Sequence, residues 1–139
     1  MSRPLPKATP ETQHFWDGTR AGELRLQRCA ACAKVYFPPR PFCPGCASRE
    51  VEVFSASGRA TLHSYVINER AMPGSGFEPP YSIAVVELEE GPRMLTNVVD
   101  IEQTPEALVL DMNLEVKFEP VSNDIALPLF RPASAEAQR

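Results

Sequence analysis

The stretch that decides the fold is Cys29-Ala30-Ala31-Cys32, followed ten residues later by Cys43-Pro44-Gly45-Cys46. These two Cys-x-x-Cys pairs contain every cysteine of the 139-residue chain. Each pair can fold as a tight turn that offers both sulfurs to one ion, and four thiolates suit a tetrahedral metal site. We therefore expect a structural zinc ribbon that binds one Zn²⁺ per chain through Cys29, Cys32, Cys43 and Cys46. A rubredoxin-like iron site, two disulfides and a redox-active Cys-x-x-Cys remain as alternatives.

Length and composition indicate one domain, or one domain with a small metal module. The chain is 43% apolar and 23% charged, as is usual for a globular protein, and it has no apolar run long enough to cross a membrane. Its N-terminus has no apolar segment typical of a secretory signal. We therefore expect a cytoplasmic protein, in which cysteines stay reduced and bind metals more often than they form cross-links.

The net charge of −4 is unevenly distributed along the chain. Residues 1–59 contain nine Lys/Arg and five Asp/Glu, whereas residues 60–139 contain five and thirteen. This pattern is compatible with ordinary solvated charge or with a local anion site beside the ribbon. Because phosphate neutralisation supplies most of the affinity of nucleic-acid binding, the acidic second half argues against that function for the chain as a whole.

The N-terminal half predicts a short helix followed by the ribbon. Residues 1–22 form a tail, extended or disordered over 1–8, and a helix over about 10–17 that begins after Thr9 and is limited or split by Gly18 and Gly22. Phe15 and Trp16 of this helix are candidates either for the core or for contact with a partner. The ribbon spans residues 23–52, with strands at 24–28 and 34–37 and a stiff proline-rich link over 38–41.

The pattern from residue 53 to 132 is all-β. We expect strands at 59–69, 81–88, 93–99, 114–118 and 125–130, with a helical turn beginning at Thr104. Alternation places Leu62, Ser64 and Val66 on one face of the first strand, and Thr61, His63, Tyr65 and Ile67 on the other. Five strands with a helical turn between the third and fourth fit a small closed barrel of the OB type. Residues 133–139 are predicted to be a disordered tail. The predicted fold is thus mostly β: an N-terminal helix, a rubredoxin-like zinc ribbon and a five-stranded OB-fold barrel.

The sequence lacks a recognisable catalytic set of its own. Its two histidines, His14 and His63, lie on different predicted elements, and no nucleophile elbow, P-loop or dinucleotide fingerprint is present. A four-cysteine site leaves no open position for a substrate. These features favour a binding or accessory protein with no catalytic residues.

Several segments in this order resemble a known family of zinc-ribbon/OB-fold proteins associated with acyl-CoA, formerly a domain of unknown function. The resemblance spans roughly residues 10–132. It departs at Asp111-Met112, where the family usually turns with glycine. The segments that resemble the family are Phe15-Trp16-Asp17-Gly18, Leu26-Gln27-Arg28-Cys29, Phe37-Pro38-Pro39-Arg40-Pro41-Phe42-Cys43-Pro44, Phe77-Glu78-Pro79-Pro80-Tyr81, Glu87-Leu88-Glu89-Glu90-Gly91-Pro92-Arg93 and Leu127-Pro128-Leu129-Phe130-Arg131-Pro132.

The resemblance implies a small subunit that works beside a thiolase-superfamily protein, whether thiolase, acyltransferase or retro-aldolase. The catalytic residues would belong to that partner, and the substrates would be acyl-CoA thioesters. Basic ribbon residues could then contact the phosphates of CoA, although some of them could instead neutralise a metal cluster that has a charge of −2. These candidates are Arg25, Arg28, Lys34, Arg40 and Arg49. Aromatic candidates for the partner interface or the acyl path, with core packing as the alternative, are Phe15, Trp16, Phe37, Phe77 and Tyr81.

Two functions of other classes remain open. OB folds and zinc ribbons both serve as single-stranded nucleic-acid-binding modules, which the acidic barrel half disfavours. Rubredoxin-like electron transfer would require iron in place of zinc.

Overall fold

A computed structural model describes residues 4–133 and contains one helix and eight strands in that range. The helix α1 spans Gln13–Arg20. The strands are β1 (Arg25–Cys29), β2 (Val35–Tyr36), β3 (Val51–Ser55), β4 (Arg59–Asn68), β5 (Tyr81–Leu88), β6 (Arg93–Thr96), β7 (Asn113–Pro120) and β8 (Ala126–Pro132). None of the helical segments in residues 4–133 is long and apolar enough to cross a bilayer.

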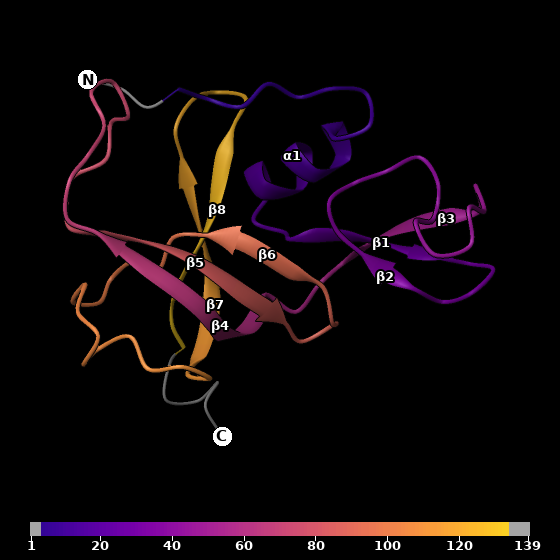
Figure 1. Cartoon of the computed structure of the whole chain (residues 1–139). Coiled ribbons are helices and arrows are strands. Elements are labelled where there is room, and N and C mark those ends of the chain that lie inside the picture. The colour runs from indigo at the N-terminus through magenta and orange to yellow at the C-terminus, as the bar shows by residue number, and fades with distance from the viewer. Residues whose placement is uncertain (1–3, 134–139) are drawn as a thin grey trace.

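The ribbon sheet has three antiparallel strands in the order β2-β1-β3. Strand β3 pairs along the whole of β1, from Arg25 opposite Ser55 to Cys29 opposite Val51. The two cysteine pairs lie at the end of this sheet, because β1 ends at Cys29 and β2 returns from the first cysteine turn. Figure 1 shows this small sheet projecting to one side of the larger one, with α1 above the junction.

The second sheet has five strands in the order β6-β5-β4-β7-β8 and curls so that its two outer strands meet. They meet just beyond β6, where Val98 forms a parallel bridge with Phe130 of β8. Two backbone hydrogen bonds fix this contact, from the Phe130 N–H to the Asn97 carbonyl oxygen (3.1 Å) and from the Val99 N–H to that of Phe130 (2.8 Å). This curled five-stranded sheet is consistent with an OB fold, and the predicted fold class is confirmed.

A β-bulge in β4 overturns the predicted alternation along that strand. The pairing with β5 shifts register between Leu62 and Ser64, so the chain gains one residue at His63 and every later side chain changes face. Val66 is consequently 57% exposed, whereas Tyr65 and Ile67 pack against the core with Leu62. The sequence pattern placed Val66 with Leu62 because strict alternation cannot reveal a bulge.

Several predicted boundaries also differ. The helix begins at Gln13 rather than at Pro10, because residues 10–12 form a turn in which the Thr12 N–H donates to the Thr9 carbonyl oxygen (3.0 Å). It continues through Gly18 to Arg20, and the chain then turns at Gly22, whose φ is +81°. The helical turn predicted to begin at Thr104 is present as a single turn, in which the Leu108 N–H donates to the Thr104 carbonyl oxygen (3.0 Å).

One hydrophobic core joins the helix, the ribbon sheet and the barrel. Phe15 of α1 and Leu26 of β1 belong to the same buried cluster as Leu62, Val86 and Phe130 of the barrel. The helix also contacts β1, β7 and β8. It approaches β1 closely at Gly18, where a Cβ atom would lie 2.7 Å from the Arg25 side chain. The ribbon is therefore held against the barrel through α1 and β1.

The N-terminal end of the described chain is irregular, whereas its C-terminal end is hydrogen-bonded to the barrel. Residues 4–9 have no regular secondary structure, and Ala133 donates its N–H to the Asn113 carbonyl oxygen (3.0 Å). The rest of the predicted disordered tail, residues 134–139, lies outside the described residues, as do residues 1–3 of the predicted N-terminal tail.

Candidate metal centre and binding surfaces

The four cysteine sulfurs form one cluster at the end of the ribbon. All four lie within 4.8 Å of one another. The distance is 3.6 Å both from Cys29 Sγ to Cys46 Sγ and from Cys32 Sγ to Cys43 Sγ. A tetrahedral site with Zn–S bonds of about 2.3 Å places its sulfurs about 3.8 Å apart, whereas a disulfide bond is only about 2.05 Å long. The cluster therefore has the size of a metal site, and its four thiols are free.

The two cysteine turns repeat the same backbone geometry. In each turn the residue after the second cysteine donates its N–H to the carbonyl oxygen of the first, from Ala33 to Cys29 and from Ala47 to Cys43 (both 2.8 Å). The Cys32 N–H also points at Cys29 Sγ (3.4 Å), as the Gly45 N–H does at Cys43 Sγ (3.3 Å). Such N–H···S contacts favour the thiolate, the form of cysteine that binds metal.

The cluster is electrostatically incomplete without a cation. Burial disfavours ionisation of Cys43, but backbone N–H groups outweigh it and lower the pKa of that thiol to about 7. The Ser48 N–H favours the Cys46 thiolate, yet contacts with the other sulfurs, that of Cys29 foremost, raise the pKa of Cys46 to about 12. Without a cation Cys46 thus keeps its proton at neutral pH, whereas a bound divalent cation favours its thiolate.

Donor set and geometry fit a structural zinc ion. Cys29 and Cys43 are buried, and Cys32 and Cys46 face outward, so the protein encloses one side of the cluster. Four sulfur donors complete a tetrahedral zinc site and leave no position for a substrate. The metal ion would therefore serve to cross-link the two cysteine turns. These turns have only a small apolar core, in which Tyr36 and Val51 pack beside the sulfurs.

The five candidate phosphate ligands are spread along the ribbon, and two of them are already paired. Arg25 bonds to Glu23 (2.7 Å), and Arg28 lies 4.2 Å above the Phe54 ring and 3.7 Å from Glu52. The other three are exposed and form no ion pair with any residue in the range 4–133. These three are Lys34, Arg40 and Arg49.

Three of the aromatic candidates meet where the helix contacts the proline-rich link. Phe15 is 3% exposed, and its ring centroid lies 5.0 Å from that of Trp16 and 5.3 Å from that of Phe37. Trp16 and Phe37 are only half-buried, and all three line an apolar groove of about 360 Å³ together with residues of β6 and β8. Phe15 is thus a core residue, whereas Trp16 and Phe37 also contribute to an accessible surface.

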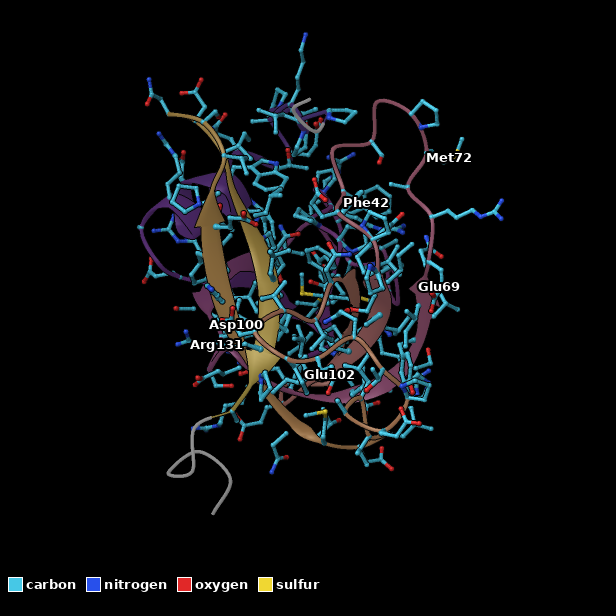
Figure 2. All side chains as sticks on the ribbon, turned by 90° about the vertical axis from the view of Figure 1, so that its left-hand side faces the viewer. Phe42, Glu69, Met72, Asp100, Glu102 and Arg131 are labelled. Atoms are coloured by element: carbon cyan, nitrogen blue, oxygen red, sulfur yellow. The ribbon has the colours of Figure 1, made fainter. Side chains whose placement is uncertain are left out.

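The remaining two aromatic candidates form a separate site. Phe77 and Tyr81 stack with ring centroids 4.4 Å apart and planes 8° from parallel. They line a pocket of about 290 Å³ between the β4–β5 loop and the segment after β6. Figure 2 shows this loop, with Met72 labelled, extending away from the barrel. The two aromatic groups therefore occupy different surfaces.

Sequence reasoning missed two polar residues that hold these parts together. Gln27, 6% exposed, accepts a hydrogen bond from the Arg40 N–H (2.7 Å) and ties the proline-rich link to β1. One carboxylate oxygen of Glu90 accepts the Ser57 N–H (2.8 Å), and the other is buried. Glu90 thereby joins the β5–β6 turn to the segment between ribbon and barrel. In the sequence, the only indication of the role of Gln27 is that it is a polar residue within an alternating strand. The sequence contains no indication of the role of Glu90.

The two histidines lie on separate elements, His14 on α1 and His63 at the β4 bulge. Burial, with the nearby Arg25, lowers the pKa of His14, and its Nε2 has no partner among residues 4–133. His63 is exposed. Neither residue completes an acid–base pair with the other.

Comparison with known proteins identifies both parts of the chain. Residues 16–52 match the model of the ChsH2 rubredoxin-like zinc ribbon domain, and residues 55–119 match that of the ChsH2 C-terminal OB-fold domain. A DUF35 domain-containing scaffold protein of Methanocaldococcus jannaschii is 36% identical over 98 residues, which are 70% of this chain and 68% of that protein.

A longer relative and a solved structure are also similar. A probable enoyl-CoA hydratase alpha subunit of Thermomonospora curvata is 34% identical over 131 residues, which are 94% of this chain but only 40% of that protein. The solved structure of an Ltp2-ChsH2(DUF35) aldolase contains a chain that superimposes with a TM-score of 0.81 at 33% identity, covering 94% of this chain and 100% of that one. The four cysteines are thus positioned to bind one zinc ion, and the chain belongs to the ChsH2-type family, which combines a rubredoxin-like zinc ribbon with an OB fold and includes the DUF35 scaffold proteins.

Proposed function

We propose that this chain is a non-catalytic, zinc-braced accessory subunit of a thiolase-superfamily complex that acts on acyl-CoA thioesters. The observation that supports this most strongly is the similarity to the whole of one chain in the Ltp2-ChsH2(DUF35) aldolase. The all-cysteine donor set adds support, because it closes the coordination sphere of the metal. A cytoplasmic location, in which the thiols stay reduced, is part of the proposal.

Exposure and ion pairing indicate which candidate residues would face the substrate. Lys34 and Arg49 are the cations available for the phosphates of CoA, because they are exposed and have no ion-pair partner among residues 4–133. Arg25 and Arg28 are less available, since each lies beside a carboxylate of its own. The pocket beside Phe77 and Tyr81 offers apolar surface for the acyl path.

Co-purification tests the proposal. The tagged chain should bring down a thiolase-superfamily protein in fixed stoichiometry from its own cells, and the reconstituted complex should bind acyl-CoA. A chain that purifies alone and turns over thioesters by itself would contradict the accessory role.

The phosphate contacts need a separate test with a matched control. Lys34→Gln and Arg49→Gln should weaken binding of CoA by the complex more than binding of dephospho-CoA, because each removes a free cation. Arg25→Gln is the control, and it should have a smaller effect because Glu23 already neutralises Arg25. Equal losses for all three variants would remove the phosphate role from this chain.

A further inference from the structure

The outer edge of β6 is open at Arg93 and Leu95. The Leu88 N–H of β5 donates to the carbonyl oxygen of Pro92, the residue before β6 (2.8 Å). The hydrogen-bonded pairs of β5 with β6 therefore fall on Met94 and Thr96. Arg93 and Leu95 therefore direct their N–H and C=O groups away from β5. Within residues 4–133 these four groups have no hydrogen-bond partner.

The neighbouring strand β8 cannot close this edge. The parallel contact between Asn97–Val99 and Phe130 would extend toward β6 only if residue 128 donated an N–H to the Leu95 carbonyl oxygen. Residue 128 is a proline and has no N–H. Its own carbonyl oxygen is occupied by the Thr96 hydroxyl (3.0 Å). The two outer strands therefore separate at Pro128, and Leu95 keeps an unused donor and an unused acceptor.

An apolar groove lies along this open edge. It is the space of about 360 Å³ described above, which we call the β6 groove, and it has no charged residue in its lining. The Leu95 side chain is 71% exposed beside it, whereas Met94 on its floor is 4% exposed. The other walls are Trp16 of α1, the proline-rich link and β8.

We propose that the β6 groove binds an extended segment of the catalytic partner, which adds to the barrel sheet as a strand beside β6. This inference rests on the proposed function for the existence of that partner. Strand addition uses backbone groups of an open edge for affinity and a groove for alternate side chains for specificity. Arg93 and Leu95 lie two residues apart, which is the spacing at which an added strand forms its hydrogen bonds to one side.

The lining and its rim define the chemistry of the segment. Because the lining is uncharged, the residues that face the floor of the groove must be apolar, with polar residues alternating toward solvent. Arg40 directly follows the Pro38-Pro39 wall, is exposed and forms no ion pair with the described part of the chain. An acidic residue at the end of the segment nearest the link complements this charge. The occupant is thus a short alternating apolar strand that ends in Asp or Glu.

Leu95→Pro tests the backbone bond in the complex. The substitution removes the outward N–H but none of the bonds to β5, and proline is tolerated on edge strands. We expect at least a tenfold loss of affinity for the co-purifying thiolase-superfamily protein, with an unchanged melting temperature. Leu95→Met keeps both the N–H and the apolar side chain, and it should bind within about twofold of wild type. Wild-type affinity of a folded Leu95→Pro variant would overturn the inference and leave the proposed function intact.

A second arm uses the isolated full chain and therefore does not depend on the partner. The peptide acetyl-Asp-Val-Thr-Val-Thr-Val-amide is titrated at millimolar concentration while amide resonances of the ¹⁵N-labelled chain are recorded. The Arg93 and Leu95 amides should shift most, and a version N-methylated at alternate residues should not shift them. If neither amide responds to the unmodified peptide, strand addition is wrong. A wild-type chain that instead dimerises, and that Leu95→Pro makes monomeric, would assign the edge to a second copy and overturn the partner assignment.

Discussion

Replacing Phe15 with alanine should destabilise the whole protein, because this ring joins its three parts. Phe15 is 3% exposed and belongs to the cluster that contains Leu26 of the ribbon sheet and Leu62 of the barrel. It also contacts the rings of Trp16 and Phe37. Its removal would open a cavity at the junction of helix, ribbon and barrel.

The size of the effect follows from this burial. Truncation of a fully buried phenylalanine costs about 3–5 kcal/mol, and aromatic pairs such as these add about 0.5–1.5 kcal/mol beyond area burial. We therefore expect a loss of about 4 kcal/mol in the free energy of unfolding. For a chain of this length the corresponding fall in melting temperature is about 12 °C. Trp16 is half-buried at the groove, so Trp16→Ala should cost only about 1–2 kcal/mol.

Urea unfolding of zinc-loaded protein, followed by far-ultraviolet circular dichroism, measures both variants. Trp16→Ala is the matched control, since it removes a neighbouring aromatic ring from the same helix. The expected order is a large shift of the midpoint for Phe15→Ala and a small one for Trp16→Ala, at unchanged slope. A loss below about 1 kcal/mol for Phe15→Ala would refute the assignment of Phe15 to the core.

Three further predictions concern the metal turns and the bulge. Cys46→Ser should abolish stoichiometric zinc binding and lower the melting temperature, measured by metal analysis and calorimetry, and full zinc retention would contradict the ligand assignment. Ala47→Gly should increase the free energy of unfolding by up to about 1 kcal/mol and raise the melting temperature slightly, because φ is +65° at Ala47. A clear loss of stability would show that this conformation is not strained. Ile67→Thr should destabilise the protein by about 1–3 kcal/mol while Val66→Thr should be within about 0.5 kcal/mol of neutral, and the reverse order in urea unfolding would place the bulge elsewhere.

The sequence predicted the metal cluster and the strands well because their signals are local. Two cysteine pairs with turn-forming neighbours define a four-sulfur site without any knowledge of the fold. The strand at Tyr81–Leu88 was predicted with its observed bounds, since its apolar centre Ile83-Ala84-Val85-Val86 is followed by a turn containing Gly91 and Pro92. The order of elements and the OB-type barrel followed from these local patterns.

The features that the sequence did not reveal depend on tertiary pairing. The bulge at His63 arises from the register of β4 against β5, which no alternating pattern of β4 alone can specify. The role of Glu90 requires that its turn meet Ser57, which is 33 residues away. The open edge of β6 likewise depends on the proline at position 128, which lies beside Thr96 and has no N–H to offer the Leu95 carbonyl oxygen. This relation becomes visible only when the barrel closes at Val98 and Phe130.

The central claim, that this chain supports chemistry performed on another chain, is tested most directly by acyl-CoA turnover in three matched samples. These are the zinc-loaded chain alone, the co-purifying thiolase-superfamily protein alone, and the two together. The account predicts no turnover by this chain alone and the highest rate in the mixture. Turnover by the isolated chain at the rate of the mixture would contradict it.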